Sequence, residues 1–109
     1  MMDGLWTAEF GGSTGIFGGG VIIFRDGKIM GGDATYYYIG EYTLKGNTLQ
    51  ATLTIYPFIE GAESVFKTVG KDLTLDLVGS LISADRAIAQ GHPRGTPQLN
   101  FGAKLTKRT

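Results

Sequence analysis

Apolar and polar residues alternate along most of this chain with a period of two. The clearest case is residues 48–56, where an apolar side chain at every second position is followed by threonine or glutamine. Residues 72–77 and 98–105 show the same alternation. Successive side chains of a strand point to opposite faces of its sheet. These segments therefore predict antiparallel strands with one buried face and one hydrated face.

Short turn signals divide the chain into about eight strands. Asp26-Gly27, between two apolar segments, is the strongest signal, because a type I′ hairpin turn needs positive φ at both central residues. Residues 91–97, rich in glycine and proline, are expected to form the clearest loop. Residues 64–71 are the only stretch where a short helical turn fits the pattern, around an unassigned segment 65–69. The expected strands cover residues 5–10, 17–24, 28–32, 36–44, 48–56, 73–81, 82–90 and 98–106.

This arrangement predicts an all-β, antiparallel, up-and-down barrel of about eight strands. Closure of such a meander removes its exposed strand edges, and an eight-stranded barrel either fills with side chains or holds one small ligand. The glycines at 18–20 suit a sharply bent strand in a barrel. An open sandwich of the same strands is the alternative, because periodicity does not separate the two folds.

Composition and charge narrow the class of protein. A length of 109 residues predicts a single domain, residues 1–109. Ten basic residues balance ten acidic ones, which disfavours direct binding to nucleic acid. The chain has no cysteine, so disulfides and thiolate chemistry are excluded. It shows neither a signal peptide nor an apolar run of about 20 residues, so we expect a cytoplasmic protein without a membrane span.

Residues with catalytic or metal-binding chemistry are few. His92 is the single histidine and has a structural or exposed role in the expected loop. No phosphate-binding loop or serine-nucleophile motif is present. We therefore expect no enzymatic activity, no metal and no cofactor. An enzyme would have to use Asp33 or Asp85 at the barrel mouth, although Asp33, after two glycines, fits a turn-stabilising role better.

Four tyrosines mark one expected strand. On it Tyr36, Tyr38 and Tyr42 share one face, and Tyr37 lies on the other. Such a face packs in the core, lines a cavity, or meets a protein partner, because tyrosine combines an apolar ring with a polar tip. The candidate cavity-lining residues are Trp6, Tyr36, Tyr38, Leu53 and Phe101.

Two resemblances to known families add to this interpretation. Gly4-Leu5-Trp6, at the first strand, resembles the Gly-x-Trp signature of lipocalins, in which the tryptophan plugs one end of the barrel. Residues 2–4, 19–23, 26–33 and 38–40 resemble the GrlR family, small negative regulators of type III secretion genes. The second resemblance covers about the first half of the chain, and its most specific element is the Gly-Gly-Asp after the hairpin.

The GrlR resemblance implies a lipocalin-like barrel that forms homodimers and is not an enzyme. It also implies regulation by binding a protein such as a transcriptional activator, and an apolar cavity that takes a lipid-like molecule. The family's acidic contact loop corresponds here to residues 44–47, which carry no acidic residue. Lys45 and Asn47 are therefore the loop candidates for contact with a partner. The alternative function is a carrier that holds a lipid-like molecule in the barrel.

Overall fold

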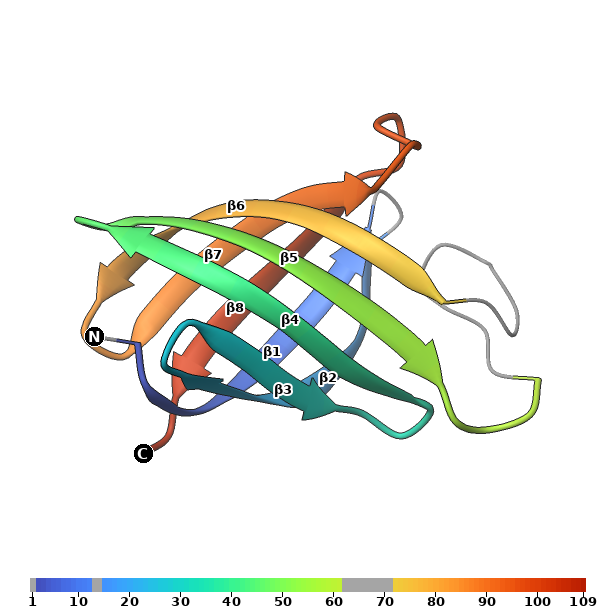
Figure 1. The fold of residues 1–109 in the computed structure, drawn as a ribbon, viewed down its shortest axis with the longest axis horizontal. Helices are drawn as coiled ribbons and strands as arrows, with labels where there is room; N and C mark the ends of the chain where they lie inside the picture. Colours follow the sequence, from blue (N-terminus) through green and yellow to red (C-terminus); the bar gives the residue numbers. More distant parts are fainter. Residues whose placement is uncertain (1, 13–14, 62–71) are drawn as a thin grey trace.

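Strands joined mostly by tight turns close on themselves into a barrel (Figure 1). The computed structural model describes residues 2–12, 15–61 and 72–109, and these form eight antiparallel strands in up-and-down order and no helix. The strands are β1 (Gly4–Gly12), β2 (Gly15–Arg25), β3 (Lys28–Gly32), β4 (Tyr36–Lys45), β5 (Thr48–Pro57), β6 (Leu73–Ser83), β7 (Arg86–Pro93) and β8 (Phe101–Lys107). The predicted barrel is confirmed, and the open sandwich is wrong.

The first and last strands pair to close the barrel. Ala8 on β1 lies opposite Gly20 on β2 and also opposite Leu105 on β8. Every strand therefore has a partner on both sides, and the backbone groups of the two terminal strands are hydrogen-bonded rather than exposed as edges. Among the described residues, no helix is long and apolar enough to cross a membrane.

The hairpin turn between β2 and β3 has the predicted geometry. Asp26 has a φ of 51° and Gly27 a φ of 78°, so both central residues are in the left-handed region. The carbonyl oxygen of Gly27 also accepts a hydrogen bond from the backbone N–H of Tyr42, at 2.9 Å. The turn is thereby attached to β4 as well as to its own strands.

Several strand boundaries differ from the prediction: β1 extends to Gly12 and β8 begins at Phe101, and larger differences occur around β7. β6 extends to Ser83, which pairs with Arg86, so the turn lies at residues 84–85 and β7 does not begin at 82. Ile82, 61% exposed, belongs to the outer surface of β6 and not to the start of β7. The predicted loop at 91–97 is also wrong at its start: Gly91 pairs with both β6 and β8, and the loop covers 94–100. The hydrogen-bonded pairing of Gly91 with strands on both sides outweighs the local preference of the Gly-His-Pro sequence for a turn. The segments 64–71 and 65–69 lie outside the described residues.

Inward-facing glycines let neighbouring strands approach closely. A Cβ at Gly40 on β4 would overlap the carbonyl oxygen of Thr52 on β5, and a Cβ at Gly31 on β3 would overlap that of Val21 on β2. Any other residue would push these strands apart. Gly19 and Gly20 on β2 are similarly crowded, since a Cβ there would lie 2.9 Å from the Ala8 carbonyl oxygen and 2.7 Å from the Tyr38 hydroxyl oxygen.

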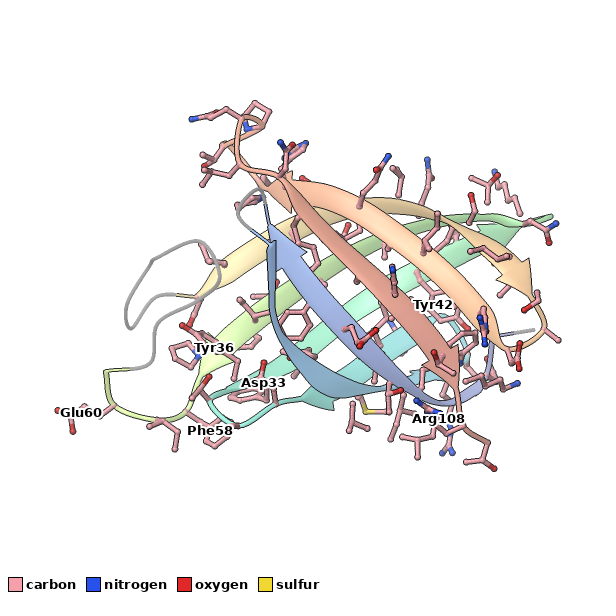
Figure 2. The ribbon with its side chains drawn as sticks, turned by 180° about the vertical axis from the view of Figure 1, so that it is seen from behind. Asp33, Tyr36, Tyr42, Phe58, Glu60 and Arg108 are labelled. Atoms are coloured by element: carbon pink, nitrogen blue, oxygen red, sulfur yellow. The ribbon has the colours of Figure 1, made fainter. Side chains whose placement is uncertain are left out.

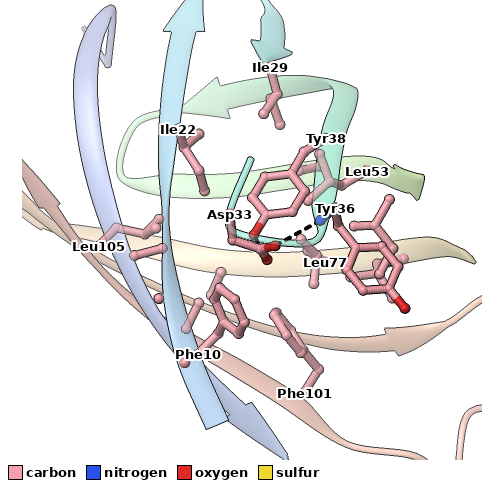
Figure 3. A pocket seen from close by; sticks show the side chains of 18 of the residues that line it. Phe10, Ile22, Ile29, Asp33, Tyr36, Tyr38, Leu53, Leu77, Phe101 and Leu105 are labelled. Atoms are coloured by element: carbon pink, nitrogen blue, oxygen red, sulfur yellow. Dashed lines mark hydrogen bonds between the residues drawn. The ribbon is translucent and has the colours of Figure 1, made fainter. Parts of the chain in front are cut away.

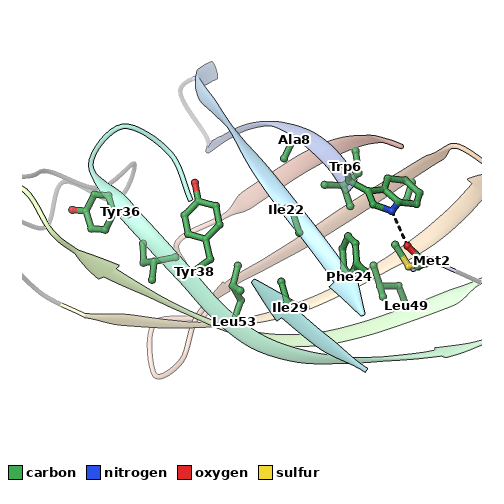
Figure 4. Close-up of a cluster of buried hydrophobic side chains, with 13 residues drawn as sticks. Met2, Trp6, Ala8, Ile22, Phe24, Ile29, Tyr36, Tyr38, Leu49 and Leu53 are labelled. Carbon is green, nitrogen blue, oxygen red and sulfur yellow. Dashed lines mark hydrogen bonds between the residues drawn. The ribbon is translucent and has the colours of Figure 1, made fainter. Parts of the chain in front are cut away.

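One end of the barrel is packed shut around Trp6 (Figure 4). Its side chain is fully buried, and its indole N–H donates a hydrogen bond to the carbonyl oxygen of Met2 at 2.8 Å. The ring of Phe24 meets the indole edge-to-face at 5.8 Å, and Tyr42 meets Phe24 in the same way at 5.0 Å. Met2 itself is 1% exposed. The N-terminal segment is thus folded back as part of a solid plug.

Removing the plug is expected to destabilise the fold strongly. Trp6→Ala should lower the free energy of unfolding by about 3–5 kcal/mol, because it leaves a cavity where a large ring was buried. Urea denaturation followed by circular dichroism measures the change. The control Ile88→Ala removes a side chain that is 45% exposed on β7 and should cost less than about 1 kcal/mol. Equal losses in the two variants would contradict this role of Trp6.

Candidate ligand-binding cavity

The interior of the barrel beyond the Trp6 plug is hollow (Figure 3). The cavity measures about 390 Å³. Gly18, Gly19 and Ala34 line it and are exposed, so it reaches the surface at the end where β3 connects to β4. Its other lining residues among those described are Ala8, Phe10, Ile22, Phe24, Ile29, Asp33, Thr35, Tyr36, Tyr38, Leu49, Ala51, Leu53, Ile55, Leu75, Leu77, Ala89, Phe101, Ala103 and Leu105.

The two ends of the barrel differ in structure. Figure 2 shows Asp33, Tyr36, Phe58 and Glu60 at one end, whereas Tyr42 and Arg108 lie toward the other. The first end carries the β3–β4 connection and the cavity mouth. The second end carries the Asp26-Gly27 hairpin, both termini of the sheet and the Trp6 plug. As far as the described residues show, the cavity is therefore open at the first end and closed at the second.

Small residues at inward positions leave the space empty. Alanines on four different strands line the cavity, where larger side chains would meet across the barrel. They alternate with outward residues: Ala89, for example, is 8% exposed, and its neighbour Ile88 is 45% exposed. An eight-stranded barrel is just wide enough for its side chains to fill it, so several alanines suffice to open a ligand-sized hollow. The alanines are Ala8, Ala51, Ala89 and Ala103.

Asp33 is the polar feature at the cavity mouth. Its Oδ1 accepts hydrogen bonds from the backbone N–H groups of Thr35 and Tyr36, both at 2.9 Å, and from the Thr35 hydroxyl at 3.4 Å. Its Oδ2 accepts a hydrogen bond from the Tyr38 hydroxyl. The predicted turn-stabilising role of Asp33 is confirmed, since the carboxylate replaces backbone partners at the start of β4. Figure 3 shows that it also points toward the interior.

Tyr38 is held in its neutral form. Burial raises the pKa of its phenol far above the ordinary value, and the hydrogen bond to the Asp33 carboxylate, with that group's negative charge, raises it further. The side chain is only 5% exposed. The phenol therefore keeps its proton and donates a hydrogen bond to Asp33 at any physiological pH.

The structure brings together four of the five predicted cavity residues. Tyr36, Tyr38, Leu53 and Phe101 all line the hollow, and Phe101 lies 5.9 Å from the ring of Phe10. Trp6 does not line it, because Met2 and Phe24 surround the indole at the closed end. The predicted division of the tyrosines is also confirmed: Tyr36 and Tyr38 point inward, Tyr42 packs against the core, and Tyr37 is 44% exposed.

Other candidate residues lie away from the cavity. Lys45 and Asn47 are exposed in and beside the β4–β5 turn at the closed end. Asp85 lies in the β6–β7 turn at that same end and accepts a hydrogen bond from Ser83 at 2.8 Å. It therefore does not lie at the cavity mouth with Asp33, and that expectation is wrong. The chain reverses direction at each turn, so the β3–β4 connection with Asp33 and the β6–β7 turn with Asp85 lie at opposite ends of the barrel.

His92 lies on β7 and not in a loop. Its Nδ1 is 3.0 Å from the carbonyl oxygen of Pro93, and its strand neighbour is Asp76. Asp76 is engaged instead by Arg94, with a 2.7 Å ion pair that lowers the pKa of the carboxyl. Within residues 2–12, 15–61 and 72–109, no group of three or more histidine, cysteine or acidic side chains is placed to hold a metal.

Sequence reasoning did not include the inward alanines or Asp33 among the candidate cavity-lining residues. The alternation of residues 48–56 and 98–105 does place Ala51 and Ala103 on the buried face. The size of those residues is thus the signal that would have indicated a hollow.

No protein-family model matches this chain, and no curated protein matches it either.

The titration of Tyr38 should be visible in the stability of the protein. Above about pH 10 the unfolded chain loses this proton while the folded protein retains it, so folded protein is disfavoured as the pH rises. The contribution of Tyr38 to the free energy of unfolding is fully present below about pH 10. Above that pH it decreases, by up to about 1.4 kcal/mol per pH unit. Urea denaturation at several pH values between about 10 and 11.5 measures this slope.

Tyr38→Phe isolates the contribution of this residue. The variant lacks the titrating phenol, so its stability should fall less steeply over the same pH range. Tyr42, whose pKa burial also raises, is present in both proteins and contributes equally. Identical slopes in the two proteins would contradict the assignment.

Proposed function

We propose that the protein binds one small apolar molecule inside its barrel. The observation that carries this proposal is a hollow of about 390 Å³ with a mostly apolar lining. This volume lies within the range of about 300–1,000 Å³ that is usual for small-molecule sites. The carrier function, expected from the sequence as the alternative to regulation, is thus the one that the geometry supports best.

The chemistry of the lining favours an aliphatic chain. Leucine, isoleucine, phenylalanine and alanine side chains surround the hollow on all sides of the barrel. Moving a hydrocarbon chain from water into such a site gains about 0.8 kcal/mol for each buried CH₂ group. The ring plug at Trp6 blocks the far end, so the chain would lie along the barrel axis with its head at the Asp33 mouth.

Filling the cavity should abolish binding. Ala89→Trp places a large ring in the hollow and should weaken the binding of the neutral fluorescent probe N-phenyl-1-naphthylamine by at least tenfold. Its matched control is Ile88→Trp on the adjacent outward position, which should bind the probe as the unaltered protein does. Fluorescence titration measures both, and circular dichroism checks that both variants are folded.

A second filling variant protects this test against misfolding. Leu53→Trp enlarges a residue that lines the cavity from β5 and should also block the probe. Native mass spectrometry of the purified protein should in addition show a bound lipid-like molecule. Probe binding that survives in both folded filling variants would refute the cavity as the binding site.

A second candidate function is contact with another protein, and an exposed apolar face supports it. Met30 on β3 pairs with Ile39 on β4, and both are about half exposed on the outside of the barrel. The face continues to Tyr37, which stacks on Tyr56 at 5.0 Å and lies near Phe58. Contiguous exposed patches rich in aromatic residues and methionine are typical of protein interfaces.

This outer face, defined by Met30, Tyr37, Ile39, Tyr56 and Phe58, is our proposed site of homodimer formation. The GrlR resemblance of the first half of the chain supports a dimer, and a regulatory role in type III secretion through an activator rests on the same resemblance. The loop at Lys45 and Asn47 lies at the closed end, away from Phe58. Contact with an activator through that loop would leave the outer face available for a second copy.

A charge in the outer face should separate the subunits. Ile39→Lys should shift the mass measured by light scattering after size-exclusion chromatography from that of a dimer to that of a monomer. Placing an ammonium group against an apolar partner surface costs more than the contact gains. The control Ile88→Lys, on the outside of β7, should leave the dimer intact. A monomeric unaltered protein, or dissociation of both variants alike, would refute this interface.

A further inference from the structure

The described part of the cavity mouth carries one charged group. Among the described residues that line the cavity, Asp33 is the only one with an ionisable side chain that is charged at neutral pH, and no lysine, arginine or histidine is present. Sites that hold anionic head groups normally supply a cation or several N–H donors. This mouth has the opposite electrostatic character.

The hydrogen-bond inventory of Asp33 leaves room for one more donor. A carboxylate has about four acceptor positions on its two oxygens. Oδ1 is occupied by the Thr35 and Tyr36 backbone N–H groups, with the Thr35 hydroxyl nearby. Oδ2 accepts from Tyr38 alone among the described contacts. With respect to the described residues, one acceptor position on Oδ2 therefore has no donor and is available to a group that enters the cavity.

The Tyr38 hydroxyl strengthens this preference for a donor. Its single proton is committed to Asp33, so toward a ligand the hydroxyl presents only its oxygen lone pairs. Its position is fixed by close packing on β2: a Cβ at Gly20 would lie 2.7 Å from the hydroxyl oxygen. The Asp33–Tyr38 pair is thus a fixed group of acceptors at the edge of an apolar hollow.

From this arrangement we infer that the ligand is a single-chain amphiphile whose head donates hydrogen bonds, an aliphatic alcohol or amine and not a fatty acid. The head would bind Asp33 Oδ2 and the Tyr38 oxygen while the chain fills the barrel. A fatty-acid carboxylate offers no proton and would place a second negative charge beside Asp33. An ester head carries no charge but also has nothing to donate. This inference rests on the proposed function and specifies its ligand class.

Four ligands of equal chain length test the inference on the unaltered protein. Decylamine, decan-1-ol, methyl decanoate and decanoate are titrated as competitors of bound N-phenyl-1-naphthylamine. The amine and the alcohol should displace the probe at concentrations at least tenfold below those needed for the ester and the carboxylate. Comparing the alcohol with the ester separates hydrogen-bond donation from charge, since both are neutral.

Asp33→Asn tests the residue itself. The amide oxygen keeps an acceptor for the Thr35 and Tyr36 N–H groups, so the turn is retained, but the negative charge and the open Oδ2 acceptor are lost. The tenfold preference for amine over carboxylate should fall below threefold. The matched control is Asp3→Asn, because Asp3 also accepts a hydrogen bond from a tyrosine, Tyr42, at 3.0 Å, yet neither residue lines the cavity. That control should keep the full preference.

The possible results distinguish this inference from the function on which it rests. Equal displacement by all four ligands, or strongest displacement by decanoate, would refute the donor-head class while leaving an apolar binding site in place. Full preference retained in Asp33→Asn would refute the role of Asp33. Absence of both probe binding and displacement by any decyl compound would refute the proposed function itself. The unaltered protein alone decides the first outcome, so the inference does not depend on the folding of a variant.

Discussion

The antiparallel pairing of β1 with β8 is the constraint on which the rest of this structure depends. Ala8 lies opposite Leu105, and this contact between the two ends of the sheet turns an eight-stranded meander into a closed wall. Closure satisfies the edge hydrogen bonds of both strands. It also forces inward side chains from all eight strands to share one interior, so that their sizes decide whether the barrel is solid or hollow.

The interior divides into a solid end and a hollow end. At one end Trp6 fills the space with Met2 and Phe24, and the fold gains packing there. Toward the other end alanines occupy inward positions, and the same closed wall encloses empty volume. A close-packed core normally leaves few voids larger than a water molecule. This hollow therefore lowers the free energy of unfolding relative to a filled barrel. A bound apolar molecule would recover this stability, which is why the cavity supports a binding function.

The mouth of the cavity combines a folding role and a chemical role in one residue. Asp33 organises the β3–β4 connection through backbone N–H groups, and its second oxygen holds the phenol of Tyr38. A residue with only the turn role would be expected to face solvent. Its inward direction, next to a buried tyrosine, gives a mostly apolar cavity a polar end.

Sequence pattern alone determined the strands, the Asp26-Gly27 turn and the faces of the tyrosines, because these depend on neighbours along the chain. It predicted the barrel but did not exclude the sandwich. It also misplaced the start of β7 and the loop at 91–97, because pairing on both sides of Gly91 outweighs the local preference for a turn. Only the tertiary structure decided that Trp6 lies outside the cavity and that the interior is hollow. These facts depend on which residues face one another across the closed barrel, and that is set by strand register over the whole sheet.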